Sequence, residues 1–377
     1  MGWNLCFALD IDMRNSRLSL FFSVLILTCI GIVMVYSASS LFALERFGDG
    51  EFFLKRHILF FIVGLILMFF VMSIDYVKLR KWTKPLLFLT ILLLLLVLIP
   101  GIGHEIRGAR RWFVIGPFSF QPSEFAKITL ILYLAEVLSR KQPKINSFSE
   151  GFLPPMLILG LCTGLIIIGP DLGTSVIIIF IASIMFYVAG IRMVHIVPMV
   201  IGSIPVVIAF IIHKAYRIER VLTFINPWRD PLGVGYQPIQ SLIAIGSGGF
   251  FGKGLGDSYQ KLYFLPEAHT DFIFSIIAEE LGFIGAAVIL FLYLSVLFHS
   301  ARIAFKSNDL FGHLIVIGII SKLAIEIGIN IAVSLALLPT KGLVLPFLSY
   351  GGSALVCNLV LIGIVLNVGK DIKNRLV

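Results

Sequence analysis

Charged residues are scarce in this chain of 377 residues: 14% are Asp, Glu, Lys or Arg, whereas 58% are hydrophobic and the mean hydropathy is +1.01. A soluble domain has about 25% charged and about 45–50% apolar residues, so a water-soluble globular protein is excluded. The net charge is +9. In a membrane protein a basic excess mainly encodes orientation, so it does not indicate nucleic-acid binding.

Cysteine is also rare, which limits both disulfides and metal sites. The four cysteines are Cys6, Cys29, Cys162 and Cys357; three lie inside apolar runs and one lies near the N-terminus. None would close an exported loop, and no C-x-x-C pair or Cys/His cluster indicates a structural zinc site. The glycines of 246–256 match neither the P-loop nor the dinucleotide pattern. We interpret them as turns, and we assign no metal ligands.

Apolar runs of roughly 17–25 residues recur along the chain, the length that crosses a bilayer core of about 30 Å. They predict an all-α, polytopic integral membrane bundle of about ten transmembrane helices with one long extracytoplasmic loop. The first run is interpreted as a retained helix, because acidic residues precede it and no small-residue cleavage site is present. The predicted helices span 18–40, 57–74, 85–100, 121–139, 152–169, 172–190, 193–212, 271–297, 312–337 and 343–367.

Basic residues predict the orientation of the bundle. With the N-terminus in the cytoplasm, the cytoplasmic segments would hold 15 Lys and Arg residues and the short opposite loops 7. Both termini are therefore predicted to be cytoplasmic. The parts are an N-terminal segment 1–17, helices one to seven in 18–212, an extracytoplasmic loop 213–270, helices eight to ten in 271–367, and a cytoplasmic tail 368–377. A loop of that length is uncommon unless it is functional.

Some charges lie inside the apolar runs, where each costs at least about 2.5–3.5 kcal/mol near the bilayer centre and suggests function. Glu124 and Lys127 are three residues apart in the first turns of the fourth predicted helix. Lys322 and Glu326 are four residues apart, which fits a structural ion pair. Glu136 is close enough to the cytoplasmic end to reach the interface.

Other charges gather at the predicted outer surface. Arg110 and Arg111 precede the fourth helix, Asp171 lies between the fifth and sixth, Asp271 opens the eighth, and Lys341 lies in the last outer loop. A carboxylate at a helix N-terminus can act only as a cap. Capping does not require basic and acidic residues on the same rim, so we predict a chemical site there.

The position of such a site at the outer surface limits the chemistry that it can perform. Nucleotides are scarce outside the cell, so a substrate activated in advance is needed, and a lipid-linked pyrophosphoryl sugar fits. Arg110, Arg111 and Lys341 would stabilise the departing pyrophosphate. Asp271 would take the proton from an attacking hydroxyl, provided that desolvation raises the pKa of its carboxyl group.

Several long patterns occur in a characteristic order. They are Ala109-Arg-Arg-Trp112 with Gln121-Pro-Ser-Glu-Phe-Ala-Lys127, Gly169-Pro-Asp-Leu-Gly-Thr174, Gln240-Ser-Leu-Ile-Ala-Ile-Gly246, Leu265-Pro-Glu-Ala-His-Thr-Asp-Phe-Ile-Phe274, Glu279-Glu-Leu-Gly282 and Pro346-Phe-Leu-Ser-Tyr-Gly-Gly-Ser353. On these patterns the chain resembles the shape, elongation, division and sporulation (SEDS) family of peptidoglycan polymerases, over about 18–370. The stretch 254–269 is most similar to the cell-division branch. Asp257, where division members often have Asn, and Tyr263, where some have an acid, leave the elongation branch as an alternative.

The resemblance implies a lipid II glycosyltransferase that acts in septal cell-wall synthesis. The 4-hydroxyl of lipid II would attack the anomeric carbon of a growing glycan held on undecaprenyl pyrophosphate, and an inverted β-1,4 bond would form. By position, Asp271 matches the family's essential aspartate, the implied general base. The implied substrate-binding set is Arg110, Arg111, Glu124, Lys127, Asp171, Glu267, His269, Lys341 and Ser349.

The resemblance also implies partners and a place in the cell. The partners are a single-span class B penicillin-binding protein, which is a transpeptidase, and small bitopic divisome proteins. The place is the bacterial cytoplasmic (inner) membrane, at the division septum. No cofactor is required by the residues themselves; a divalent cation, Mg²⁺ or Mn²⁺, near the pyrophosphate is compatible with the site, without assigned ligands.

Two other functions stay open. A lipid II flippase would need charges spread across the membrane, whereas most of these charges lie towards the outer rim. Only Glu136, Lys322, Glu326, Glu279 and Glu280 are placed deeper. A non-enzymatic scaffold that recruits the transpeptidase would give no function to Asp271 or to the basic residues at the predicted outer surface.

Overall fold

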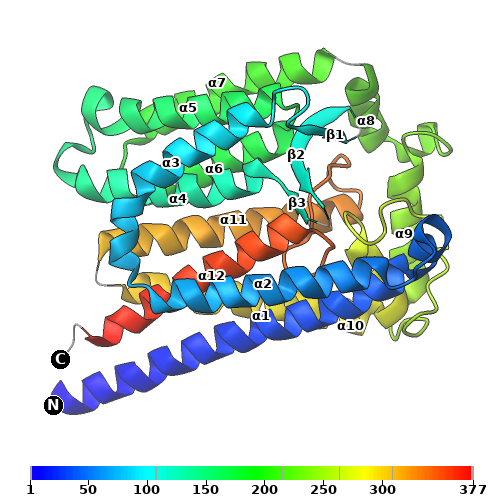
Figure 1. Cartoon of the computed structure of the whole chain (residues 1–377), viewed down its shortest axis with the longest axis horizontal. Coiled ribbons are helices and arrows are strands. Elements are labelled where there is room, and N and C mark those ends of the chain that lie inside the picture. Colours follow the sequence, from blue (N-terminus) through cyan, green and yellow to red (C-terminus); the bar gives the residue numbers. More distant parts are fainter. Residues whose placement is uncertain are drawn as a thin grey trace.

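The computed structural model describes residues 2–106, 108–116, 118–213, 215–262, 264–307 and 309–374. Long helices run side by side along one direction, and α1 begins at the end of the bundle where α12 finishes (Figure 1). The bundle helices are α1 (Gly2–Phe47), α2 (Phe52–Ser73), α3 (Leu79–Leu96), α4 (Pro122–Arg140), α5 (Leu153–Ile168), α6 (Leu172–Val188), α7 (Met193–Ile212), α10 (Ile273–Lys306), α11 (Leu310–Ser334) and α12 (Gly352–Asn374). Arg107, Tyr263 and Arg375, which entered the sequence interpretation, lie outside the described residues.

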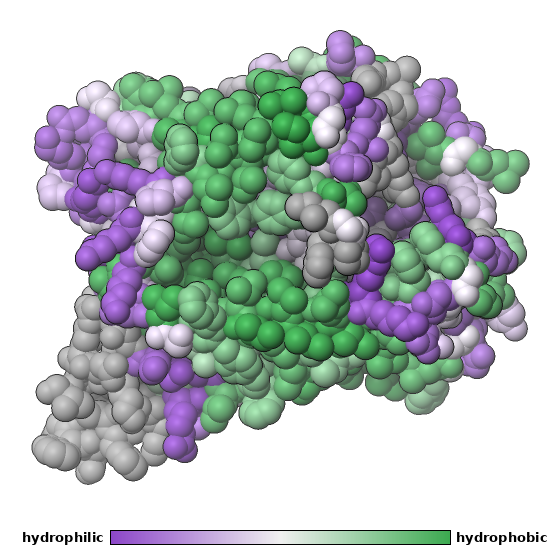
Figure 2. All heavy atoms as spheres, in the orientation of Figure 1, coloured by the Kyte–Doolittle hydropathy of each residue, from purple (hydrophilic) through white to green (hydrophobic). Residues whose placement is uncertain are grey.

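Seven of the described helices are long and apolar enough to cross a membrane, by length and composition. The helix α6 is slightly shorter, and α3 and α4 carry more charged residues. The helix α4 packs between α3 and α11, and α6 contacts α11 as well as α4 and α5. A hydrophobic belt covers the middle of the molecule, and hydrophilic residues gather at both ends (Figure 2). The predicted all-α, polytopic membrane bundle is therefore confirmed.

The last predicted helix begins nine residues later than predicted. The segment 343–351 is irregular, and α12 starts at Gly352. Pro346 lacks an amide hydrogen, and Phe347 has a positive φ of 67°, which helices do not accommodate. Leu343, Leu345, Phe347 and Leu348 are buried, so the apolar run here indicates a buried turn rather than a helix.

A small antiparallel sheet replaces the predicted arginine-rich loop before α4. It contains β1 (His104–Ile106), β2 (Ala109–Ile115) and β3 (Phe118–Phe120), in that order. Arg110 pairs with Glu105 and Ser119 with Val114 across the strands. The aromatic and β-branched run of β2 favours a strand, and that signal was missed. The Ser353 hydroxyl at the start of α12 donates to the Ser119 carbonyl, 2.7 Å away, and so fixes β3 above the bundle.

The segment 213–270 is folded at the end of the bundle opposite to the start of α1 (Figure 1). It contains α8 (Ala215–Ile225), a single helical turn over Pro227–Arg229, and α9 (Tyr236–Gly248). The irregular chain after α9 is held by two buried carboxylates of α10. Glu279 accepts hydrogen bonds from Lys253 Nζ and from the Ser258 hydroxyl, and Glu280 forms an ion pair with Lys261 over 2.9 Å.

The helix α10 is broken at Gly282, whose φ of 69° and ψ of −167° are not helical. Gly252 lies directly against this break, with its own φ of 79°. The amide of Phe283 donates to the Gly249 carbonyl over 2.9 Å, so the chain after α9 pairs with the broken turn. The first part of α10, which follows Asp271, is thereby a separate short helix at the end of the long span.

Replacing Gly282 by Ala should destabilise the protein by about 1–3 kcal/mol, because the new Cβ would need a positive φ and would collide with the backbone of Gly252. The measurement is thermal unfolding of the purified protein in detergent. Gly246→Ala in α9 is the matched control, since nothing lies within 4 Å of its built Cβ. Equal unfolding temperatures for the two variants would contradict this account of the break.

Candidate functional site

Asp271 lies at the end of a tightly wound segment that leads into α10. The carbonyl of Glu267, a residue with a φ of 61°, accepts hydrogen bonds from the amides of Thr270 and Asp271, each 3.1 Å away. The Asp271 side chain is half-buried, and its Oδ2 lies 3.6 Å from the position of a Cβ built on Gly342. The predicted base therefore faces the loop between α11 and α12, at a residue without a side chain.

Asn330 of α11 ties these two segments together. Its Nδ2 donates to the Asp271 carbonyl over 3.0 Å and to the Leu343 carbonyl over 2.6 Å. The side chain is 2% exposed, so both hydrogen bonds form away from water, where they are strongest. Sequence reasoning missed Asn330, although it lies four residues after Glu326 on the same face of α11.

Two other predicted residues in the Asp271 segment have packing or local contacts. The His269 ring is buried against Phe53, with a 4.6 Å separation of ring centroids, and near Tyr350 at 5.9 Å. The His269 carbonyl accepts a hydrogen bond from the Tyr350 amide. The Glu267 carboxylate accepts one from the Thr270 hydroxyl over 3.0 Å. These contacts hold the segment in place beside the start of α2.

Asp171 and Arg111 meet at the corner between α5 and α6. Asp171 caps α6: its carboxylate accepts hydrogen bonds from the amide and the hydroxyl of Thr174, at 3.2 and 2.9 Å. The Arg111 guanidinium lies 3.8 Å from Asp171 Oδ1 and donates to the carbonyls of Gly169 and Pro170. The structure thus brings together two residues that are 60 positions apart in the chain.

Lys341 reaches the same corner from the loop between α11 and α12. A Cβ built on Gly173, in the first turn of α6, would overlap Lys341 Cε and would lie 3.1 Å from Nζ. Burial lowers the pKa of Lys341, and the nearby Asp171 carboxylate opposes that shift. Lys341 precedes Gly342, the residue that Asp271 faces. One short stretch of chain therefore connects the Asp271 carboxylate to the corner formed by Asp171 and Arg111.

A pocket opens beside this corner, between α3, α4, α5 and β2. Its polar lining comes from Arg110, Arg111, Ser123 and Asp171. The rest of the lining is mostly apolar and comprises Leu94, Val97, Leu98, Pro122, Leu165, Ile166 and Gly169. Arg110 lies at the rim, where it forms a 3.2 Å ion pair with Glu105. The pocket is small, and its two arginines are side chains of the kind that bind phosphate oxygens.

Glu124 and Lys127 lie in a different environment from the rim residues. The Lys127 ammonium is 2.7 Å from Glu124 Oε1 and 2.5 Å from Glu326 Oε1, and Lys322 is 2.7 Å from Glu326 Oε2. Lys322 also donates to the Asn358 side chain of α12. The two pairs that the sequence treats separately thus form one buried network. The network joins α4, α11 and α12.

Ser349, the last predicted substrate-binding residue, is buried within the turn that precedes α12. Its hydroxyl accepts a hydrogen bond from the Leu345 amide over 2.8 Å, and its own amide donates to the Leu345 carbonyl. The hydroxyl therefore closes the five-residue turn 345–349, a usual use of serine side chains. The corner of the site nearest to α12 is shaped by this turn.

Comparison with known sequences identifies a family that covers nearly the whole chain. The sequence model of the FtsW, RodA and SpoVE cell cycle proteins matches residues 17–374. A probable peptidoglycan glycosyltransferase FtsW of Trichlorobacter lovleyi is 48% identical over 94% of this chain and 93% of its own length. Stage V sporulation protein E of Bacillus subtilis is 47% identical over 92% and 94%.

Solved structures agree with the sequence comparison. A chain of a peptidoglycan synthase complex, described as coordinating polymerisation and crosslinking, superimposes with a TM-score of 0.76 and 31% identity, over 94% of this chain and 97% of that chain. The rod shape determining protein RodA of Thermus thermophilus superimposes with a TM-score of 0.70 and 30% identity, over 93% and 96%. Both identities and both coverages are high enough to support common ancestry as well as a common fold.

Replacing Lys127 by Met should destabilise the bundle by about 3–5 kcal/mol, because two carboxylates would lose their shared cation inside the protein. Thermal unfolding in detergent measures the loss. Lys55→Met is the matched control, since the side chain of Lys55 is largely exposed in its ion pairs with Asp49 and Glu51. A Lys127→Met protein that unfolds at the temperature of the control would show that the network does not stabilise the fold.

Proposed function

Because the chain belongs to the FtsW, RodA and SpoVE family of cell cycle proteins, we propose that it is a peptidoglycan glycosyltransferase of the cell-division type. Its substrates are lipid II and the lipid-linked nascent glycan, which it polymerises during septal cell-wall synthesis. The single observation that carries this proposal is the short path from the Asp271 carboxylate through Gly342 and Lys341 to the corner of Asp171 and Arg111. It supports the proposal because the candidate base faces the residue next to Lys341, one of the cations that suit a pyrophosphate.

The reaction that fits this geometry has one proton transfer and one bond exchange. Asp271 accepts the proton of the lipid II 4-hydroxyl, whose oxygen attacks the anomeric carbon of the growing glycan. The bond from that carbon to the pyrophosphate breaks as the β-1,4 bond forms, and its electron pair leaves on undecaprenyl pyrophosphate with inversion at carbon. A pyrophosphate leaving group needs charge neutralisation rather than a proton, so one carboxylate base suffices.

The pyrophosphate is assigned to the side of the site that carries Arg111 and Lys341. Arginine can bind phosphate oxygens in a bidentate manner, and lysine acts as a point charge. The N-terminus of α6 adds its dipole at the same place, next to Gly173. The apolar lining of the pocket beside β2 suits the first units of a polyprenyl chain. Glu124 and Lys127 are assigned to support of the bundle rather than to substrate contact.

A divalent cation fits this site only as a companion of the pyrophosphate. Among the described residues, no group of three or more His, Cys, Asp or Glu side chains gathers in the way that a protein-borne metal site needs. Mg²⁺ is commonly bound by one or two carboxylates together with substrate phosphates, and Asp171 is the carboxylate nearest to the assigned place. When bound, such a cation would neutralise part of the pyrophosphate charge.

The protein is a multi-pass membrane protein, and its further placement is part of the proposal. Both termini are cytoplasmic and the site is extracytoplasmic, in the bacterial cytoplasmic membrane at the septum. A class B penicillin-binding protein is the proposed partner, supported by the synthase complex that contains a similar chain; bitopic divisome proteins are proposed as well. The flippase alternative is disfavoured, because Lys127, Lys322 and Glu326 are engaged with one another inside the bundle.

Asp271→Asn should lower lipid II polymerisation by about 10²–10⁴-fold, because the amide cannot accept the hydroxyl proton. The assay uses purified protein with its class B transpeptidase and labelled lipid II, and it scores muramidase-sensitive polymer. Asp257→Asn, an exposed loop substitution, is the matched control and should keep wild-type activity. Polymer formed at the wild-type rate by Asp271→Asn would remove the general-base role, and lipid II crossing between liposome leaflets without polymer would favour a flippase.

Lys341→Met should reduce polymerisation by about 10²-fold, the typical loss when one charge-stabilising donor is removed. Lys341→Arg should shift the alkaline limb of the pH–rate profile upwards. The pKa of Lys341 is lowered, so its ammonium loses a proton at a lower pH than an ordinary lysine does, whereas arginine stays charged. An unchanged alkaline limb in Lys341→Arg would show that the ammonium of Lys341 does not set the pH dependence.

A further inference from the structure

The helix α8 presents an apolar face away from the bundle. Ile218, Leu222 and Ile225 recur at the spacing of one helix face and are 36%, 44% and 74% exposed. Trp228 and Leu232, which follow the helix, are 66% and 89% exposed. Exposed apolar side chains so close together indicate a surface that is covered in the working protein.

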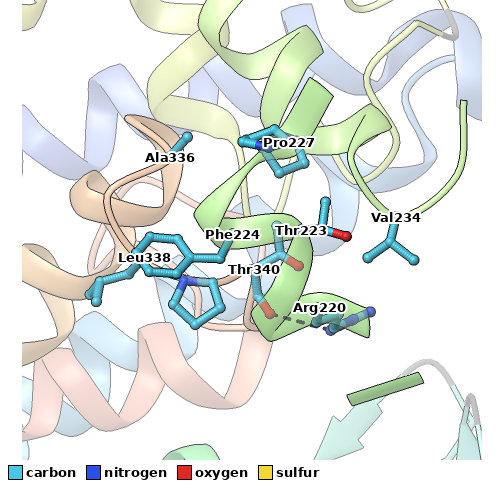
Figure 3. Close-up of a pocket in the computed structure, with 10 residues that line it drawn as sticks. Arg220, Thr223, Phe224, Pro227, Val234, Ala336, Leu338 and Thr340 are labelled. Atoms are coloured by element: carbon cyan, nitrogen blue, oxygen red, sulfur yellow. Dashed lines mark hydrogen bonds between the residues drawn. The ribbon is translucent and has the colours of Figure 1, made fainter. Parts of the chain in front are cut away.

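The opposite face of α8 contacts the loop that carries Lys341. Arg220, Thr223 and Phe224 line a small pocket whose other wall is formed by Leu338 and Thr340 (Figure 3). Arg220 Nη1 donates to the Thr340 carbonyl over 3.3 Å, as the dashed line in Figure 3 shows. Because Thr340 immediately precedes Lys341, α8 supports the backbone of a residue assigned to pyrophosphate binding.

The helix before α8 places it at the surface of the membrane. The preceding span α7 has a single buried residue, Ile196, so most of its surface is available to lipid. Arg217 at the start of α8 donates to the Phe210 carbonyl of α7 over 2.7 Å, with its guanidinium 3.6 Å from the centre of the Phe210 ring. This contact fixes the corner between the helices, and α8 runs across the direction of the bundle (Figure 1).

We propose that α8 lies in the headgroup region of the outer leaflet, with Ile218, Leu222 and Ile225 in the acyl boundary, and thereby holds the Lys341 loop at a fixed height above the bilayer. An amphipathic helix with an arginine-bearing polar side commonly lies in this plane. The lipid surface is favoured over a second copy of the chain because α8 follows α7, whose surface is largely exposed, and is held to its end by the contact of Arg217 with Phe210. The importance of the Lys341 loop for catalysis rests on the proposed function, whereas the position of α8 at the membrane surface does not.

The position of α8 at the membrane surface is tested with single-tryptophan reporters in lipid nanodiscs. In a background with Trp3, Trp82, Trp112 and Trp228 replaced by Phe, one variant adds Leu222→Trp on the apolar face. The matched control adds Glu219→Trp, which lies on the exposed polar side of the same helix. Quenching is measured with phospholipid that carries a doxyl group near the acyl carbonyl, and with aqueous acrylamide.

The lipid-borne quencher should act at least about two-fold more strongly on the Leu222→Trp reporter than on the Glu219→Trp reporter, and acrylamide should show the reverse order. A Leu222→Trp reporter reached by acrylamide and not by the lipid would place the face in water and overturn the proposal. A reporter reached by neither would mean that protein covers the face, which also overturns it. Neither readout depends on polymerisation, so failure here is distinct from failure of the proposed function.

The coupling to the Lys341 loop is tested by amide hydrogen exchange in the same nanodiscs. Leu222→Asp should raise α8 from the acyl boundary and speed exchange across 336–343, whereas Glu219→Gln should leave exchange there unchanged. Both variants must keep the unfolding temperature of the parent protein to within the error of the measurement; Leu222→Asn replaces Leu222→Asp if the acid does not fold. Unchanged exchange across 336–343 in a folded variant would overturn the supporting role of α8.

Discussion

The pairing of charges between α4 and α11 is the constraint on which the rest of the structure depends. A lone charge inside an apolar bundle is costly, so Lys127 of α4 has to meet Glu326 of α11, and this contact fixes the register of the two helices. About one turn before Lys127, α4 begins beside the Asp171 corner, where the Ser123 hydroxyl lies 3.5 Å from Asp171 Oδ2. Along α11, four residues beyond Glu326, Asn330 holds the Asp271 segment and the last outer loop. The network therefore aligns both halves of the candidate site, although no member of it needs to touch substrate.

The sequence predicts more of the fold than of the site geometry, for physical reasons that particular residues show. Membrane spans are set by local composition, so the apolar runs predict the bundle helices without any knowledge of their packing. The same signal fails at 343–351, because a buried irregular turn and a membrane helix are equally apolar, and only Pro346 distinguishes them. The Arg111 region was interpreted as a loop because of its two arginines, although the aromatic and β-branched run of β2 favours a strand.

Contacts between segments that are distant in the chain could not be predicted from this single sequence. The pairing of Arg111 with Asp171 depends on how α5 and α6 meet, and the approach of Lys341 to Gly173 depends on the path of a whole loop. Isolated polar residues in apolar runs were the signal that could have revealed Asn330 and Asn358. Each is a buried amide on a bundle helix, and burial of an amide requires a specific partner elsewhere in the fold. In both cases the partner belongs to the Asp271 segment or to the charged network.

The charges inside the bundle and the charges at the rim differ in how far they are already neutralised by other side chains. Inside the bundle, Lys127, Lys322 and Glu326 neutralise one another at short range, so their charges are already used to join helices. At the rim, Lys341 lies against Gly173 without an ion pair among the described residues, and Arg111 approaches Asp171 only to 3.8 Å. Two glycines allow these side chains to approach closely: a Cβ on Gly173 would collide with Lys341, and a Cβ on Gly342 would lie 3.6 Å from Asp271 Oδ2. The proposed polyanionic substrate would therefore meet the rim cations without first breaking a buried ion pair, as the proposed transfer from a pyrophosphate needs.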